Sequence, residues 1–205
     1  MAEITLYHAS PSRSAVILWL LEELGVPYDI KLLSLKDGEA QKPEFLALNP
    51  MGKVPVIVHK GVAISETGAI ATYLADAFPE AGLGVPVSDP RRGVYLKWMF
   101  FNSACVEPAI LERAFPRKEP APRSAAGFGT ADLVIDVLAQ AASAARPYLL
   151  GAQFTAADVV LGSGLRFGTM FKLLPEREEF KAYLAALEAR PPLKRANERD
   201  IALRK

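Results

Sequence analysis

The sequence has 205 residues, of which 51% are hydrophobic and 23% charged, so it has apolar material for buried cores and length for two small domains. Lysine and arginine number 24 against 23 acidic residues, and a formal charge of +1 gives no long-range field that would attract nucleic acid or anionic lipid. A single cysteine, Cys105, excludes an internal disulfide and a cysteine-built metal cage, and two isolated histidines, His8 and His59, indicate no metal site.

Two features of the sequence bear on where in the cell the protein is found. No uncharged apolar run approaches the roughly 18 residues that span a bilayer, so an integral membrane protein is not expected. Residues 1–7 lack the basic run and apolar stretch of a secretory signal, and we therefore expect a cytoplasmic protein.

The first 80 residues alternate between strand and helix patterns. Residues 4–7 indicate a buried strand, and apolar side chains at helical spacing follow over 12–24. Gly25 has the position of a helix C′ residue, and residues 28–32 alternate as a half-buried strand does. The first unit is therefore predicted to be βαβ.

A hairpin and a helix are predicted next. Residues 54–58 and 62–64 flank the turn-prone pair Lys60-Gly61, and apolar residues at helical spacing follow over 70–78. This completes βαβ followed by ββα.

Residues 79–90 are rich in proline and glycine and interrupt the periodic pattern, as a linker does. We therefore predict a first domain over 1–80, a linker over 81–90 and an all-helical domain over 91–205. Its helices are expected from about 91 to the region of Cys105, over about 130–149, from 155 onward and around 180–187, with an irregular loop over 118–129.

One helix of the second domain carries a start signal. Thr155 and Asp158 have the T-x-x-D spacing of a capping box, and Phe154 and Val159 stand where a hydrophobic staple has its two members. These residues are predicted to fix the start of a core helix and to bind no ligand.

The turn Ser10-Pro11-Ser12-Arg13-Ser14 lies between the first strand and the first helix. A helix N-terminus offers unpaired N–H groups and a partial positive charge that favour an anion such as a thiolate, and a serine hydroxyl there could donate to it. The alternative is that one of these serines only caps the helix.

Two further segments have polar groups placed for a ligand. Glu66 and Thr67, after the hairpin, could meet the ammonium and carboxylate of an amino-acid-like ligand, or Ser65 could cap the helix with Glu66 favourable to its dipole. Pro55 immediately precedes a strand, and its peptide bond to Val54 is a candidate cis bond.

The order of these pieces resembles the soluble glutathione transferase family across essentially the whole chain. Residues 12–28 are similar to that family's first helix and second strand. The segment 49–55 resembles N-P-x-G-x-V-P, and Ser65-Glu66-Thr67-Gly68-Ala69-Ile70 resembles E-S-x-A-I with threonine for serine. The T-x-x-D box matches the family's second-domain signature.

The resemblance implies an α/β plus all-α fold, with a thioredoxin-like βαβ-ββα domain that binds glutathione and a helical domain that forms a pocket for a hydrophobic electrophile. It implies that Val54 presents backbone groups to the cysteinyl part of glutathione with Pro55 cis, and that Glu66 and Thr67 hold the γ-glutamyl end.

Basic residues are given weaker roles by the resemblance. Lys53, and less directly Lys42, could meet the glycine carboxylate of glutathione, although surface lysines are usually only solvated. Arg13 could attract the anion or be solvated. Because position 13 is arginine, a cysteine-type mechanism has no residue to use.

Three hydroxyls compete as the group that activates the thiol. Ser12 and Ser10 flank the position of the serine-type enzymes, and Tyr7 stands where the tyrosine classes have theirs but can equally be a packing residue. Ser12 or Ser10 is preferred, which predicts a bacterial-type, serine-type (theta- or delta-like) member. The hydroxyl would donate to the sulfur and lower the thiol pKa.

The electrophile pocket is predicted from an aromatic and methionine stripe in the second domain. Its members are Tyr95, Trp98, Met99, Phe101 and Asn102. A stripe at helical spacing is more often core than pocket, and that alternative stays open.

The resemblance implies a homodimeric glutathione transferase with a detoxification role, glutathione as co-substrate and no metal. The alternatives are a glutathione-dependent peroxidase, dehalogenase or isomerase, and a non-catalytic glutathione-binding stress protein. A disulfide exchanger is disfavoured because the sequence has no C-x-x-C.

Overall fold

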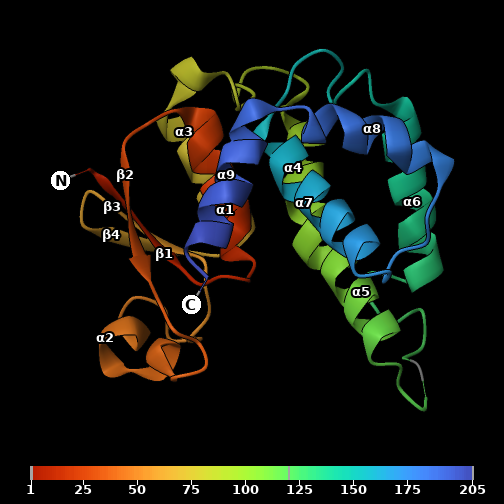
Figure 1. The fold of residues 1–205 in the computed structure, drawn as a ribbon. Coiled ribbons are helices and arrows are strands. Elements are labelled where there is room, and N and C mark those ends of the chain that lie inside the picture. The colour runs from red at the N-terminus through yellow and green to blue at the C-terminus, as the bar shows by residue number, and fades with distance from the viewer. Residues whose placement is uncertain (1, 120, 205) are drawn as a thin grey trace. The chain divides into compact units, whose positions relative to one another are not determined.

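The computed structural model describes residues 2–119 and 121–204, which fall into two compact units. One unit comprises Met1–Gly84 together with Arg190–Lys205, and the other comprises Val85–Ala189. The elements of both are labelled in Figure 1.

The first unit is built on a mixed four-stranded sheet. The strands are β1 (Ile4–His8), β2 (Tyr28–Leu32), β3 (Val56–His59) and β4 (Val62–Ser65). Their spatial order is β2-β1-β3-β4, with β1 parallel to β2 and antiparallel to β3, and β3 antiparallel to β4. A parallel β1–β2 pair needs a crossover, which the intervening helix supplies. The predicted βαβ-ββα fold is confirmed.

Four α-helices accompany this sheet. They are α1 (Ser14–Leu24), α2 (Pro43–Leu46), α3 (Thr67–Ala77) and α9 (Pro191–Ala202), with short 3₁₀ turns at Glu39–Gln41 and Pro79–Ala81. Alternation along β1 directs the buried Ile4, Leu6 and His8 to the face that meets α1. Tyr7 points to the opposite face and packs against Phe45 of α2.

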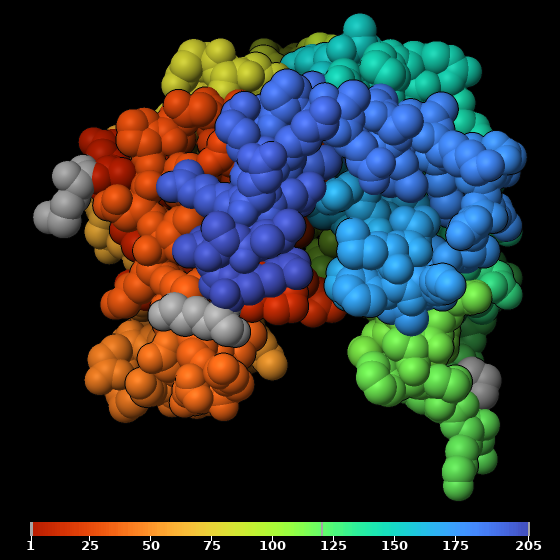
Figure 2. All heavy atoms as spheres, in the orientation of Figure 1, coloured from red at the N-terminus to blue at the C-terminus, as the bar shows by residue number. Residues whose placement is uncertain are grey.

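The segment 190–205 was predicted to belong to the second domain, but it groups with the first unit. Helix α9 runs beside α1 (Figure 1) and covers part of that helix in the space-filling view (Figure 2). Ion pairs explain this arrangement, because Glu23 of α1 binds Arg190 and Glu22 binds both Arg195 and Arg199. The sequence pattern predicted no helix here, since two prolines and many charged residues obscure its apolar face.

The second unit is helical, as predicted. Its helices are α4 (Arg92–Phe101), α5 (Glu107–Ala114), α6 (Ala131–Ala144), α7 (Ala156–Met170) and α8 (Glu178–Glu188). A π-helical turn over Asn102–Val106 joins α4 to α5, so the helix predicted to stop near Cys105 continues to Ala114. Within the described ranges, no helix has both the length and the apolar character needed to cross a membrane.

The capping box at the start of α7 is confirmed. Asp158 accepts hydrogen bonds from the N–H and the hydroxyl of Thr155, at 2.9 and 3.0 Å. Its other oxygen accepts from the N–H of Leu149 at 2.9 Å and from the Tyr183 hydroxyl at 3.2 Å. These four donors satisfy a carboxyl group whose burial raises its pKa, so the box is a structural element of the second unit.

Candidate functional site

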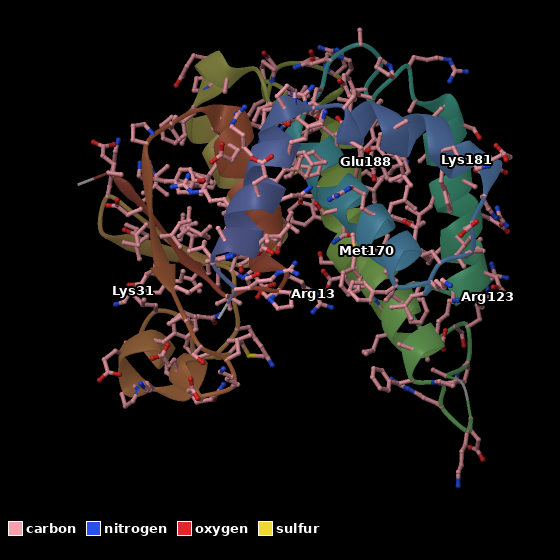
Figure 3. The ribbon with its side chains drawn as sticks, in the orientation of Figure 1. Arg13, Lys31, Arg123, Met170, Lys181 and Glu188 are labelled. Atoms are coloured by element: carbon pink, nitrogen blue, oxygen red, sulfur yellow. The ribbon has the colours of Figure 1, made fainter. Side chains whose placement is uncertain are left out.

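The turn between β1 and α1 is held by serine side chains. The Ser12 hydroxyl oxygen accepts a hydrogen bond from the N–H of Ser14 at 3.1 Å, which satisfies one of the free donors at the start of α1. Ser12 is half-buried, and its exposed neighbour Arg13 is the N-cap residue by backbone position (Figure 3). Ser12 thus lies at the positive end of the helix dipole.

Ser14 is the centre of a buried hydrogen-bond cluster. Its Oγ lies 2.7 Å from Oγ of Ser12 and 2.8 Å from Nδ1 of His8. It also accepts a hydrogen bond from the N–H of Ala9 at 3.1 Å and can donate to the carbonyl of Ala9 at 3.2 Å. Both Ser14 and His8 are fully buried. The hydroxyl of Ser12 is therefore connected through Ser14 to an imidazole that solvent does not reach.

Asp200 of α9 faces the other side of this imidazole. Its Oδ1 lies 3.1 Å from Nε2 of His8, a close electrostatic contact outside straight hydrogen-bond alignment. Its Oδ2 accepts a hydrogen bond from the Ser10 hydroxyl at 2.8 Å and a longer one from Arg204 at 3.4 Å. Burial lowers the pKa of His8, against the opposing charge of Asp200.

Sequence reasoning missed His8, Ser14 and Asp200 as members of this cluster. Ser14 and His8 had a local signal, because strand alternation and the first helical turn bring positions 8 and 14 to the same side of β1. Asp200 had none, since 190 positions separate it from Ser10.

The three predicted activating hydroxyls have different surroundings. The Ser10 hydroxyl donates to a carboxylate, which accepts only, so its proton is committed to Asp200. The ring of Tyr7 packs in the cluster of Ala40, Phe45 and Val56, and Nζ of Lys31 lies 5.2 Å from its centroid. Ser12 has a hydroxyl neighbour that can either donate or accept, so it can direct its proton outward.

Asn49 and Gly52 shape the loop that leads through Val54 to β3. The buried Asn49 donates to the carbonyl of Lys53 at 2.8 Å and accepts from the N–H of Met51 at 3.1 Å. Gly52 has a φ of +61°, and a Cβ there would meet the side chain of Gln41 and the carbonyl of Ala40, so only glycine fits. The Val54–Pro55 peptide bond is cis, which confirms that prediction.

Glu66 and Thr67 lie where β4 leads into α3. Glu66, and not Ser65, is the N-cap residue of α3, and its φ of +69° is unusual for a residue with a side chain. Glu66 is exposed, Thr67 is half-buried, and the helix starts at Thr67. A carboxylate and a hydroxyl are thus presented together at a helix N-terminus, a position suited to a ligand carrying both an ammonium and a carboxylate.

The predicted basic residues lie at the surface. Lys53 and Arg13 are exposed. Lys42 forms an exposed ion pair with Glu39 at 3.4 Å. This favours the alternative that Lys42 is an ordinary surface lysine and does not bind the ligand.

The predicted electrophile-pocket residues lie in the second unit. Tyr95, Trp98, Met99 and Asn102 are buried, whereas Phe101 is half-buried. The structure accounts for the four buried residues as core side chains, and the pocket stays a prediction. Sequence reasoning also missed the exposed apolar residues at the end of α7, which include Phe167, Met170 (Figure 3) and Phe171.

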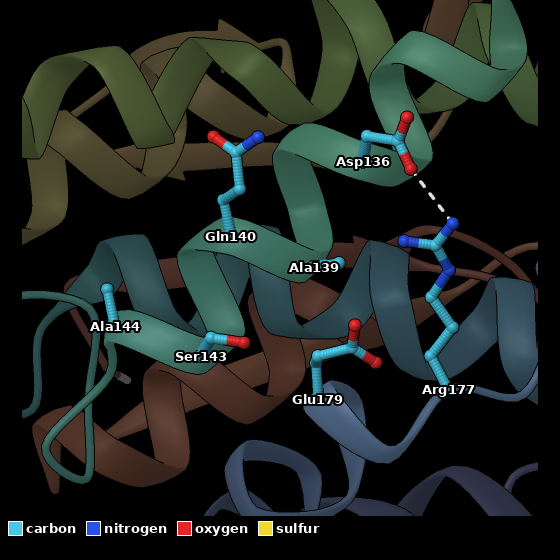
Figure 4. Close-up of a pocket in the computed structure, with 7 residues that line it drawn as sticks. All are labelled: Asp136, Ala139, Gln140, Ser143, Ala144, Arg177 and Glu179. Atoms are coloured by element: carbon cyan, nitrogen blue, oxygen red, sulfur yellow. Dashed lines mark hydrogen bonds and ion pairs between the residues drawn. The ribbon is translucent and has the colours of Figure 1, made fainter.

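An open hollow lies between α6 and α8 within the second unit (Figure 4). It is lined by Asp136, Ala139, Gln140, Ser143, Ala144, Arg177 and Glu179. Arg177 binds Asp136 at 2.8 Å across it. None of the predicted site residues lies here. In the part of the chain that the structure describes, no group of three or more His, Cys, Asp or Glu side chains is placed to hold a metal ion.

Comparisons with known proteins converge on one family. Residues 2–76 match the family model described as glutathione S-transferase, N-terminal domain. Glutathione S-transferase 3 of Schizosaccharomyces pombe is 37% identical over 107 residues, which span 52% of this chain and 44% of that protein. The glutathione S-transferase-like protein OpS6 of Beauveria bassiana is 29% identical over 204 residues, covering 90% and 89% of the two chains.

A solved structure extends the likeness in fold to nearly the whole chain. The glutathione transferase URE2P6 of Phanerochaete chrysosporium, in complex with oxidized glutathione, superposes with a TM-score of 0.80 over 98% of both chains at 24% identity. The fold of both units is therefore shared with this protein.

Proposed function

Because residues 2–76 match the N-terminal domain of glutathione S-transferases and both units share the fold of such enzymes, we propose that the chain is a serine-type glutathione transferase that activates the thiol of glutathione for attack on a hydrophobic electrophile. The observation that carries this proposal is the position of Ser12 at the N-terminus of α1, with its hydroxyl bonded to Ser14 and able to donate outward. Structures with bound glutathione among the chains of similar fold support the choice of co-substrate.

Ser12 is the activating hydroxyl in this proposal. A hydrogen bond from Ser12 to the sulfur, together with the dipole of α1, stabilises the thiolate and lowers the thiol pKa. Ser10 is less suited, because its proton is held by Asp200 and a thiolate beside that carboxylate would be repelled. The nucleophile belongs to glutathione, and the protein supplies its ionisation and position.

The remainder of the site binds the tripeptide. The backbone of Val54 pairs with the cysteinyl part, as an added strand pairs with a sheet edge. Glu66 accepts from the γ-glutamyl ammonium, and Thr67 donates to the carboxylate beside it. Lys53 and Arg13, both exposed, supply positive charge to an anionic ligand.

The proposal extends to the cellular location, the oligomeric state and the biological role of the protein. The protein acts in the cytoplasm as a homodimer, and its electrophile is bound by the helical unit. Detoxification of reactive small molecules is the corresponding role.

The test is the thiol pKa of bound glutathione, measured by ultraviolet difference titration of the thiolate. We expect a depressed pKa in the parent that returns toward the free value in Ser12→Ala, with smaller changes in Ser10→Ala and Tyr7→Phe. Conjugation of a chromogenic aryl halide should fall in parallel by about 10²-fold in Ser12→Ala. Glutathione binding without any thiol pKa shift in the parent would favour a non-catalytic binding protein instead.

A further inference from the structure

We propose that His8 is the internal acceptor of the thiol proton, reached through Ser12 and Ser14 and held by Asp200 of the C-terminal helix α9. The inference rests on the proposed function and deepens it, because it states where the proton goes when glutathione ionises. The contacts that carry it are a continuous series: Ser12 to Ser14 at 2.7 Å, Ser14 to His8 at 2.8 Å, and His8 to Asp200 at 3.1 Å.

The tautomer of His8 follows from its neighbours. Oδ1 of Asp200 lies 3.1 Å from Nε2 of His8, outside hydrogen-bond alignment, and we assign the proton to Nε2 because this oxygen attracts it electrostatically. Burial lowers the pKa of His8, so the resting imidazole is neutral and Nδ1 has a free lone pair. In this resting state the Ser14 hydroxyl directs its proton to Nδ1 and not to the carbonyl of Ala9, which lies 3.2 Å away, and the Ser12 hydroxyl donates to Ser14.

In that resting arrangement the Ser12 oxygen is available to accept a proton. The thiol S–H bond breaks and its proton bonds to Oγ of Ser12, while the original Ser12 proton passes to Oγ of Ser14 and the original Ser14 proton passes to Nδ1 of His8. Sulfur keeps the electron pair and becomes a thiolate. Each serine ends with one proton as before, and the single net change is a proton moved from sulfur to imidazole.

The transfer also reverses the direction of every hydrogen bond in the series. His8 now donates to Ser14, Ser14 donates to Ser12, and Ser12 donates to the thiolate. The same two serines thus deliver the proton inward and then stabilise the anion left outside. Asp200 faces the imidazolium, as the aspartate does in a Ser-His-Asp triad.

Burial opposes a charge on His8, and Asp200 supplies the opposite charge that the imidazolium needs. On α9, Asp200 faces the ring and Arg204 contacts its far oxygen at 3.4 Å. On α1, Arg13 is exposed, and on β2, Lys31 lies over the ring of Tyr7, which points to the opposite face of β1. His8 does not touch the substrate, so it is a positioning and relay residue and Ser12 is the group in contact with sulfur.

The experiment follows the imidazole nitrogens by NMR in protein labelled with ¹⁵N-histidine. The sequence contains two histidines, and His59 is the matched control because it is also buried but contacts Tyr73 at 2.9 Å. We expect His8 to be a neutral Nε2–H tautomer in the free protein and in complex with S-methylglutathione, which has no thiol proton. Glutathione should convert His8 to the imidazolium and leave His59 unchanged.

A second measurement compares protons released to solvent with thiolate formed on binding. The relay predicts fewer protons than thiolates in the parent and in His59→Gln. His8→Asn keeps an acceptor for Ser14 but cannot take the proton. In this variant the fraction of bound glutathione present as thiolate should fall by about 10²-fold, and one proton should be released to solvent for each thiolate that still forms. Thiolate formation with His8 still neutral would overturn the relay alone, whereas absence of thiolate in the parent would overturn both the relay and the proposed transferase function.

Discussion

Arg190 and Glu23, which are 167 positions apart in the sequence, are joined by two hydrogen bonds of 2.7 and 2.6 Å between guanidinium and carboxylate. The Glu23 side chain is only 2% exposed, and it also accepts from the indole N–H of Trp19 at 2.8 Å. A paired geometry of this kind gives direction as well as energy. It fixes the start of α9 on α1 and thereby places Asp200 beside His8 ten residues later.

Arg190→Ala should destabilise the first unit by about 3 kcal/mol, because it leaves the Glu23 carboxylate buried without its cation. The free energy of unfolding can be followed in the first unit alone, since Trp19 and Trp98 are the two tryptophans of the chain and Trp98→Phe leaves only Trp19. Arg195→Ala is the control, because the Arg195 side chain is 52% exposed and its loss should lower the free energy of unfolding by at most about 1 kcal/mol. Equal losses of stability in Arg190→Ala and Arg195→Ala would show that the burial of Glu23 does not determine the cost of removing its partner.

The pH dependence of stability should report Glu22. Burial alone would raise its pKa, but hydrogen bonds from Tyr28, Arg195 and Arg199 outweigh burial and hold the pKa below its ordinary value of 4.5. A depressed carboxyl pKa contributes stability that is present above the unfolded value and is lost as the pH falls through the folded value. Near neutral pH the free energy of unfolding of the parent should therefore exceed that of Glu22→Gln by about 1 kcal/mol, and this difference should vanish in acid.

Urea titrations at several pH values between neutral and strongly acidic conditions would measure this difference. A difference that persists unchanged in acid would mean that Glu22→Gln acts through packing and not through charge.

Gly164→Ala should destabilise the second unit by about 1–3 kcal/mol, because an added Cβ on α7 would collide with the buried side chain of Asn102. Gly93→Ala on α4 is the control, because a Cβ added at Gly93 would meet no atom within 4 Å. This variant should stabilise the second unit by about 0.5–1 kcal/mol. Thermal unfolding monitored through Trp98 in a Trp19→Phe background distinguishes the two. Similar shifts in both variants would contradict the close approach of α7 to the π-helical turn.

Glu66→Gln should weaken glutathione binding about tenfold or more, because in the proposed site the γ-glutamyl ammonium would lose its ion pair and donate to an uncharged amide oxygen. Isothermal titration calorimetry gives the dissociation constant directly. Glu44→Gln, which changes an exposed carboxylate on α2, should leave binding unaltered. Unchanged affinity in Glu66→Gln would remove this residue from the proposed site.

The features that the sequence predicted correctly are local. The strands, the hairpin, the cis bond before Pro55 and the capping box of Thr155 and Asp158 each arise from residues close together in the chain. The ligand-binding residues of the site stay predictions. They were assigned from short sequence motifs, and no bound ligand tests them. The electrophile pocket rested on a helical stripe, and such a pattern does not separate a core from a lining.

What the sequence could not predict depends on distant pairing. Helix α9 has mostly charged residues and two prolines at its start, and its reason to form lies in the acidic residues of α1. The partnership of Asp200 with His8 and Ser10 follows from that docking alone. Periodicity describes which face of a helix is apolar, but a set of ion pairs between remote helices leaves no periodic trace.

The return of residues 190–204 to the first unit has a consequence for biosynthesis. The second unit is contiguous in the sequence, whereas the first is complete only after the segment that carries Arg190 and Asp200 has been synthesised. A released chain that ends at residue 189 would therefore contain the whole sequence of the helical unit. Its first unit would lack α9, and His8 would lack its neighbouring carboxylate.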